Sequence, residues 1–338
     1  MLKGEQSWVF PRRPVIVATG VTGGPFEGNG KLAQDFDLLH DDLWMGEDSY
    51  EKAHRLLIDE AIEIALKKAK LQKENIEFLI AGDLINQIPP TTFAARNVGI
   101  PYFGISGACS TSMEGLALAA FIVNYQGAKH VLTGSGSHNA AAERQFRYPT
   151  EYGGQKPPTA QWTATAAGFA IVTEQNEQNQ NEPKVTMATI GKVIDMGMTD
   201  PFNMGGAMAP AAVDTILAHF KDTGRTHEDY DLIVTGDLAK VGRAAALDLI
   251  HAKGIDLPSE KFQDCGLMIY KDDQEVHSGG SGSGLSAAVL YGHLLKQMKY
   301  GTYKKILCVA TGSLHSPLSV QQGESIPCIA HAVAIEMD

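Results

Sequence analysis

The sequence has few cysteines, and it lacks the spacings that a metal site or a redox pair requires. The four cysteines in 338 residues are Cys109, Cys265, Cys308 and Cys328, and no two of them form a CxxC or CxxxC motif. These spacings exclude a cysteine-based zinc site and a dithiol redox centre. Scattered cysteines of this kind are typical of a protein in a reducing compartment.

Basic residues and long apolar runs are also scarce. The chain has 28 Lys and Arg against 39 Asp and Glu, a net charge of −11 at pH 7, and no basic run. This balance argues against a nucleic-acid partner, because neutralising phosphates needs a surplus of Lys and Arg. No stretch approaches 18 consecutive apolar residues, and the N-terminus has no signal-type apolar core. We therefore expect a soluble chain without a signal or transmembrane segment, associated with a membrane only peripherally.

Two loops lack the motifs that would make them ligand sites. The glycine-rich stretch 20–30, GVTGGPFEGNG, has neither a GxGxxG register nor a following Lys-Ser/Thr pair, which argues against a nucleotide site. The acidic stretch 35–48, DFDLLHDDLWMGED, lacks the spacing of a calcium loop and is expected to be a solvated face. The sequence therefore predicts no cofactor and no metal site of its own.

Strands and helices alternate along the rest of the chain. Apolar runs at 14–21, 76–85, 102–106 and 129–137 indicate buried strands. Apolar residues at helical spacing predict an amphipathic helix over 49–71, and a central helix is predicted over 113–126. This order predicts an α/β fold with a mixed or parallel sheet.

The second half of the sequence repeats the first. NIEFLIAGDL (75–84) matches DYDLIVTGDL (229–238), and HVLTGSGSH (130–138) matches LCVATGSLH (307–315). A polar stretch between the repeats, EQNEQNQNEPK (174–184), reads as a hairpin tip or linker. We therefore predict two halves related by a pseudo-twofold axis, 1–174 and 184–338, whose central helices pack together. The counterpart of Cys109 in the second half is then close to Gly282.

Cys109 lies at the start of the first central helix, in GISGACSTSMEGLALAA (104–120). The helix dipole and the free amides at such a position can lower a thiol pKa from about 8.5 toward 7, which would make Cys109 a nucleophile. The same amides can instead bind an anion. A buried structural cysteine is the third reading, and the local pattern leaves all three open.

The sequence resembles the thiolase-like superfamily of ketoacyl synthases and thiolases in three features: its duplicated halves, the motif ACSTS before a helix, and the segment PTAQWTATAAGFAIVTE (158–174). A closer resemblance is to the stage V sporulation protein AD family, and it rests on the segments WVFPRRPVIVATG (8–20), AGDLINQ (81–87) and PTAQWTATAAG (158–168). The resemblance implies a duplicated five-layered α-β-α-β-α fold with Cys109 at the nucleophile position. The catalytic His and Asn of the superfamily are not matched, because LIVTGDLAK (232–240) and HSGGSGSG (277–284) stand in their places. Carbon–carbon bond formation without them would be badly impaired.

The family resemblance implies a sporulation protein that binds dipicolinic acid (pyridine-2,6-dicarboxylate) and supports its uptake into the developing spore. It further implies a peripheral place on the forespore or spore inner membrane, with other stage V sporulation membrane proteins as partners and a homodimer left open. The alternative is an active acyltransferase or condensing enzyme that uses Cys109. The missing His and Asn favour binding over catalysis.

A planar dianion requires N–H donors, hydroxyls and an apolar slot. The Cys109 helix start, its Ser/Thr cluster and the glycine-rich stretches 134–136 and 279–284 are the expected sources. The candidate ligand-binding residues are Asp83, Cys109, Ser110, Thr111, His138, Arg147, Asp237, Gly282 and His315. Asp83 would repel a dianion unless it is protonated or bridged by calcium bound together with dipicolinate. Alternatively, Asp83 and its repeat partner Asp237 cap the turns after their strands.

Overall fold

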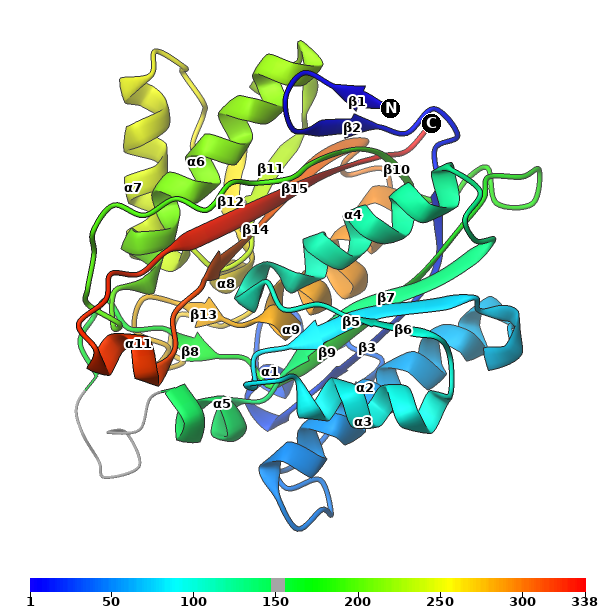
Figure 1. Cartoon of the computed structure of the whole chain (residues 1–338), viewed down its shortest axis with the longest axis horizontal. Coiled ribbons are helices and arrows are strands. Elements are labelled where there is room, and N and C mark those ends of the chain that lie inside the picture. Colours follow the sequence, from blue (N-terminus) through cyan, green and yellow to red (C-terminus); the bar gives the residue numbers. More distant parts are fainter. Residues whose placement is uncertain (147–155) are drawn as a thin grey trace.

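One long mixed β-sheet organises the computed structural model, which describes residues 1–146 and 156–338 (Figure 1). Its strands follow the order β12-β11-β14-β15-β10-β3-β9-β7-β5-β6. In the first half they are β3 (Val15–Gly23), β5 (Phe78–Asp83), β6 (Tyr102–Gly104), β7 (His130–Ser137) and β9 (Ala166–Thr173). In the second half they are β10 (Lys184–Thr189), β11 (Leu232–Thr235), β12 (Phe262–Asp264), β14 (Lys305–Ser313) and β15 (Cys328–Glu336). The short strands are β1 (Leu2–Lys3), β2 (Ser7–Val9), β4 (Leu38–Leu39), β8 (Trp162–Thr163) and β13 (Gly280–Ser281).

The strand pairing repeats between the halves, as the sequence repeats predict. In the first half β6, β5 and β7 are parallel, and β7, β9 and β3 pair antiparallel. In the second half β12, β11 and β14 are parallel, and β14, β15 and β10 pair antiparallel. The two sets meet where β10 lies antiparallel to β3, with Lys184 opposite Val15. The chain therefore contains the same five-stranded unit twice.

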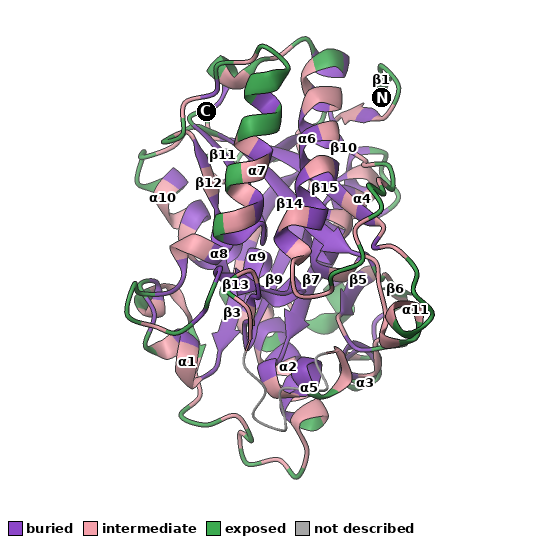
Figure 2. Cartoon of the chain, turned by 90° about the vertical axis from the view of Figure 1, so that its left-hand side faces the viewer, coloured by how far each residue is buried: buried purple, intermediate pink, exposed green. Residues whose placement is uncertain are grey.

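Helices cover both outer faces and fill the space between the two sets of strands. On one outside α2 (Tyr50–Ala69) packs on β3 and β9 beside α3 (Pro89–Val98), and on the other α6 (Met204–Thr223) packs on β14 and β15 beside α7 (Ala239–Ala252). Between them lies α4 (Thr111–Asn124), which contacts β7 and β15, next to α9 (Ser283–Ala288). Figure 2 shows these strands mostly in the buried colour. The expected five layers are confirmed.

The two central helices pack together as expected, and a hydrogen bond joins them. The Ser112 and Ser286 hydroxyls lie 2.7 Å apart. After α9 the helix continues through a π-helical turn (Val289–Leu294) into α10 (Leu295–Lys299). The remaining short helices are α1 (Pro25–Gly28), α5 (Asn139–Phe146), α8 (Cys265–Met268) and α11 (Pro317–Gln321). No helix in residues 1–146 or 156–338 is both long and apolar enough to cross a bilayer.

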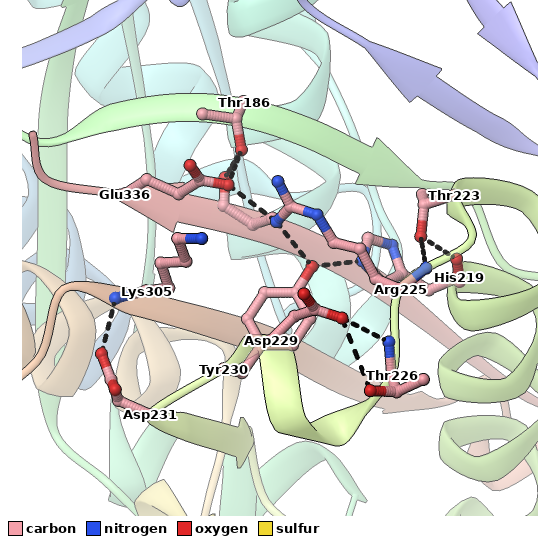
Figure 3. A network of polar contacts seen from close by, with 11 residues as sticks. Thr186, His219, Thr223, Arg225, Thr226, Asp229, Tyr230, Asp231, Lys305 and Glu336 are labelled. Atoms are coloured by element: carbon pink, nitrogen blue, oxygen red, sulfur yellow. Dashed lines mark hydrogen bonds and ion pairs between the residues drawn. The ribbon is translucent and has the colours of Figure 1, made fainter.

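A buried polar network ties the end of β15 to the loop after α6 (Figure 3). The Tyr230 hydroxyl lies 2.6 Å from His219 Nε2 and accepts a hydrogen bond from Arg225 at 3.1 Å. Arg225 also pairs with Glu336 at 2.7 Å, and the Thr186 hydroxyl donates to Glu336 at 2.9 Å. Burial lowers the pKa of His219 to about 4, so its ring is neutral at pH 7. These contacts fix one end of the second half.

The two halves are joined by a mostly exposed connection, residues 174–183, which leads from β9 to β10. The last residue, Asp338, pairs with Arg13 at 2.9 Å and with the buried Lys184 at 3.0 Å. The linker expected from the polar sequence is thus present. Gly134 and Gly136, in contrast, lie inside β7, so the glycine-rich stretch 134–136 is not a turn.

Candidate functional site

A cavity of about 630 Å³ is lined by residues from the ends of β5 and β14 and from α5 and α11. Asp83 ends β5 and Ser313 ends β14, and both lie in its wall with Cys109. The lining residues are Asp83, Leu84, Ile85, Asn86, Gln87, Ser106, Ala108, Cys109, Ala142, Gln145, Phe146, Thr163, Pro201, Phe202, Met204, Ser281, Ser313, Leu314, His315, Pro317, Val320 and Gln321. The two halves therefore build this cavity together.

A tight turn places Cys109 on the wall of the cavity. Ala108–Ser110 forms a single 3₁₀ turn that leads directly into α4. Ala108 has φ of +50°, a left-handed conformation that is uncommon for a residue with a side chain. The Cys109 side chain is buried, with 8% of the residue exposed. The expected position at a helix start is confirmed.

Of the three readings of Cys109 that the sequence leaves open, the thiolate nucleophile is the one that its surroundings disfavour. Burial raises the thiol pKa well above its ordinary value, and the neighbouring Asp237 carboxylate raises it further. Ser281, whose Oγ lies 4.0 Å from the sulfur, opposes this effect. Desolvation and a nearby negative charge both disfavour a thiolate, and together they outweigh the helix start. Cys109 is therefore a neutral thiol at pH 7.

Asp237 lies behind Cys109 and outside the lining of the cavity. Its Oδ2 accepts from Ser281 Oγ at 3.0 Å and from the Gly282 amide at 3.1 Å, and its Oδ1 accepts from Thr311 Oγ1 at 2.7 Å. Burial raises its pKa. The turn after β11 is instead capped by Asp264, which accepts from the amides of Leu238 and Ala239. Asp237 therefore holds the chain together beneath the thiol.

Asp83 lies in the cavity wall, but its oxygens bind its own chain. Oδ1 accepts from the Ile85 amide at 2.8 Å, and Oδ2 accepts from the amide and hydroxyl of Thr91 at 2.9 and 2.5 Å. This is the turn-capping role that the sequence left open. Burial raises its pKa to about 6. The side chain is thus largely ionised at pH 7 and largely neutral at pH 5.

Three other predicted residues lie beneath the surface of the cavity. The Ser110 hydroxyl donates to Gly107 O at 2.6 Å, and the Thr111 hydroxyl donates to Ala108 O at 2.7 Å. Gly282 contributes its amide to Asp237. These groups shape the turn around Cys109 and do not line the cavity.

The two predicted histidines have different positions. His315 lines the cavity, and its Nδ1 lies 2.7 Å from the Ser313 hydroxyl. His138 is buried away from it, with Nε2 2.8 Å from Leu43 O. Burial lowers the pKa of His138 to about 4. Arg147 lies outside the described residues.

The sequence did not point to most of the wall. Ser281 lies at the end of β13 and contacts Cys109, and Asn86, Gln87 and Gln145 add amide groups. Pro201, Phe202 and Met204 add an apolar side. None of the lining residues within 1–146 and 156–338 is Lys or Arg. In the same part of the chain, no three His, Cys, Asp or Glu side chains are placed to hold a metal ion.

The burial of Cys109 works against activation of its thiol. A nucleophilic cysteine needs a base or a lowered pKa, whereas the pKa of Cys109 is raised and its sulfur contacts the Ser281 hydroxyl at 4.0 Å. The cavity offers neutral donors and apolar surface, which is a usual composition for a small-molecule site.

Solved structures with the same fold include a 3-oxoacyl-[acyl-carrier-protein] synthase III and OleA. The chain matches 3-oxoacyl-[acyl-carrier-protein] synthase III from Aquifex aeolicus with 16% identity, over 96% of this chain and 99% of that one, at a TM-score of 0.58. It matches a variant of OleA from Xanthomonas campestris with 14% identity, over 97% of each chain, at a TM-score of 0.64. At these identities the likeness shows a thiolase-like fold alone.

Closer relatives give the family. The family model for stage V sporulation protein AD matches residues 4–336. Stage V sporulation protein AD of Bacillus subtilis (strain 168) is 48% identical over 335 residues, which cover 99% of this chain and 98% of that protein. The chain therefore belongs to the stage V sporulation protein AD family, and its role lies in sporulation.

Proposed function

We propose that this chain binds dipicolinic acid in the cavity beside Cys109 and supports its uptake into the developing spore. The observation that supports the proposal is a cavity of about 630 Å³ with a buried, neutral thiol in its wall. Cys109 keeps its place, while Asp237 and Ser281 are its polar partners. Such a site can hold a small acid without reacting with it.

The lining suits a flat dicarboxylate. Phe202, Leu314 and Pro317 provide apolar surface for a pyridine ring, and the amides of Asn86 and Gln145 are hydrogen-bond donors for carboxylates. The oxygens of Asp83 already accept three hydrogen bonds. Calcium, where it takes part, therefore enters as a complex with dipicolinate, whose carboxylates supply hard oxygen ligands.

Calorimetric titration tests this proposal. Dipicolinate is titrated into the protein at pH 5.5 and 7.5, with and without calcium, and the isomer pyridine-3,5-dicarboxylate serves as the ligand control. Leu314→Trp should fill the cavity and abolish binding, whereas Leu318→Trp is the matched control, because Leu318 is 63% exposed and lies outside the lining. Absence of heat at millimolar dipicolinate in every condition would refute the proposal.

The alternative, an acyltransferase that uses Cys109, is supported by the position of the thiol on the cavity wall. Incubation with acyl-coenzyme A donors, followed by intact mass measurement, separates the two functions. An acyl adduct that is absent in Cys109→Ala would establish the alternative. An unmodified mass is expected.

We also propose that the chain acts peripherally at the spore inner membrane together with other stage V sporulation membrane proteins. The family name supports a role in the same stage of sporulation. Co-purification from sporulating cells with a tagged chain tests the association, and light scattering of the purified protein distinguishes a monomer from a homodimer.

A further inference from the structure

A second cleft, of about 260 Å³, lies along β3. Four consecutive residues of this strand, 16–19, line it together with residues of the π-helical turn and of α10. Among the described residues, none lines both this cleft and the cavity beside Cys109. The cleft is therefore a separate feature of the molecule, and like the cavity it is built by both halves.

The pseudo-twofold relation explains why the cleft is open. The Ile16 amide donates to Pro183 O at 2.9 Å, and the Val185 amide donates in return to Pro14 O at 2.8 Å, so β3 and β10 occupy equivalent places. Along one edge, β10 pairs with β2. In the part of the chain that the structure describes, the corresponding edge of β3 pairs with other strands only at its two ends, with β10 and with β4. An unpaired edge presents backbone N–H and C=O groups, and the cleft lies along this one.

The helix beside this edge also differs between the halves. Phe121 lies four residues before Tyr125, the C-cap residue of α4, and packs on Trp8 of β2 with ring centroids 4.6 Å apart. The residue four positions before Tyr300, the C-cap residue of α10, is Lys296. An aromatic pair thus closes this place in one half, whereas a lysine faces the cleft in the other.

Three lysines line the cleft. Lys68 comes from the last turn of α2, and Lys296 and Lys299 lie three residues apart on one face of α10. Their side chains are 39–45% exposed. The cavity beside Cys109, by contrast, has no Lys or Arg among its described lining residues. In a chain with a net charge of −11, an anion therefore finds the more favourable potential in this cleft.

Two aspartates in the lining hold these lysines in place. Asp37 accepts from the Val21 amide at 2.9 Å and pairs with Lys68 at 2.6 Å. Asp35 pairs with Lys296 at 3.2 Å. Because a lysine ammonium group has three N–H donors, contact with one carboxylate leaves it able to donate to a second anion.

The remaining charged neighbours lie outside the lining. The second carboxylate oxygen of Asp35 lies 2.7 Å from His293 Nδ1, so Asp35 is shared between two basic side chains. Lys299 pairs with Glu182 at 2.5 Å. Within the lining, three lysines face two aspartates, which leaves an excess of one positive charge.

We propose that this cleft is a second ligand site, which binds a phosphate group carried by a small ester or by a lipid headgroup. A phosphate has three oxygens for hydrogen bonds and a charge that lysines bind well. Ile16, Val17 and Leu295 provide apolar surface for the part of the ligand next to the phosphate. The volume lies slightly below the range of about 300–1,000 Å³ that is typical of ligand pockets, so this part is short.

Calorimetric titration at pH 7.5 and low salt tests the site with three probes. These are inorganic phosphate, glycerol 3-phosphate and vesicles of phosphatidylglycerol, with phosphatidylcholine vesicles as the control. Binding of glycerol 3-phosphate without a preference for phosphatidylglycerol assigns a soluble ester, and selective binding of phosphatidylglycerol assigns a lipid headgroup. Either result should weaken as salt is added, because half-exposed charges are screened. Absence of binding by all three probes at millimolar concentration would overturn the proposal.

Lysine variants show whether the probe lies in the cleft. Lys68→Gln and Lys296→Gln should each weaken binding about 3- to 10-fold, the effect of one charged hydrogen bond after screening by water. Lys221→Gln is the matched control, because Lys221 is 71% exposed, pairs with Glu5 and lies outside the cleft. Unchanged affinity in the double variant of Lys68 and Lys296 would overturn the proposal.

The cavity beside Cys109 provides the last control. Leu314→Trp, which should fill that cavity, is expected to leave phosphate binding unchanged, since Leu314 does not line the cleft. Loss of phosphate binding in this variant would place the phosphate in the cavity and refute a second site. The proposal does not depend on dipicolinate, so either proposal can fail while the other holds.

Discussion

Asp83→Asn should remove a specific part of the pH dependence of stability. Burial raises the pKa of Asp83 from 3.8 to about 6, so the native state binds this proton more tightly than the unfolded chain does. The resulting stabilisation is fully present below pH 4 and is lost as the pH rises through 6. One pKa unit corresponds to about 1.4 kcal/mol, so the loss is about 3 kcal/mol. The asparagine side chain does not titrate, so the variant lacks this pH-dependent part of the stability.

Urea unfolding followed by circular dichroism between pH 4.5 and 7.5 measures the effect. The free energy of unfolding of the native protein should fall relative to that of Asp83→Asn as the pH rises, and most of the change should lie between pH 4.5 and 6.5. Glu27 and Asp264, whose pKa values burial raises to about 7, titrate in both proteins and cancel in the difference.

A matched control is Asp272→Asn, which removes an exposed carboxyl whose pKa is lowered by Lys31. This variant should retain the fall in stability between pH 4.5 and 6.5. The reasoning is refuted if the native protein and Asp83→Asn give parallel curves over the whole range.

Three further predictions concern the ligand and the fold. Dipicolinate affinity, measured by calorimetry, should increase several-fold between pH 7.5 and 5.5 as Asp83 loses its charge, and this increase should be absent in Asp83→Asn. Gly282→Ala should lower the free energy of unfolding by about 1–3 kcal/mol, because Gly282 has φ of +117° and a Cβ there would lie 2.8 Å from Ser137 Oγ. Urea unfolding measures this, and an unchanged midpoint would contradict it. Tyr230→Phe should lower the free energy of unfolding by about 1–3 kcal/mol, because it removes a hydrogen-bond acceptor of Arg225. Dipicolinate affinity should stay unchanged, because this network lies at the other end of β15 from the cavity.

The fold was predictable from the sequence because its signals are local and repeated. Apolar runs that end in Gly-Asp mark β5 and β11, and the helical spacing over 49–71 gives α2. Ser49 caps α2 through the Lys52 amide, so a short-range pattern fixes its start. The same logic placed Cys109 at the start of α4.

The chemistry of the site was less predictable, because it depends on contacts between the halves. The pKa of Cys109 is set by burial and by Asp237, which is distant in sequence. His138 and His315 follow equivalent strands, yet only His315 lines the cavity, since the loop carrying Leu43 covers His138. The apolar wall of Pro201, Phe202 and Met204 lies just before α6 and at its first residue, where no periodic pattern would reveal it.

The exposed connection at residues 174–183 is a place where the chain can be cut without touching the cavity. It lies beside the junction of β3 and β10, where Asp338 also pairs with Arg13 and Lys184, and it contributes no residue to the cavity. A protease site introduced there would yield two polypeptides, one carrying Cys109 and the other carrying Asp237. The two polypeptides could then be varied separately and recombined, and titration with dipicolinate would show whether the cavity forms again.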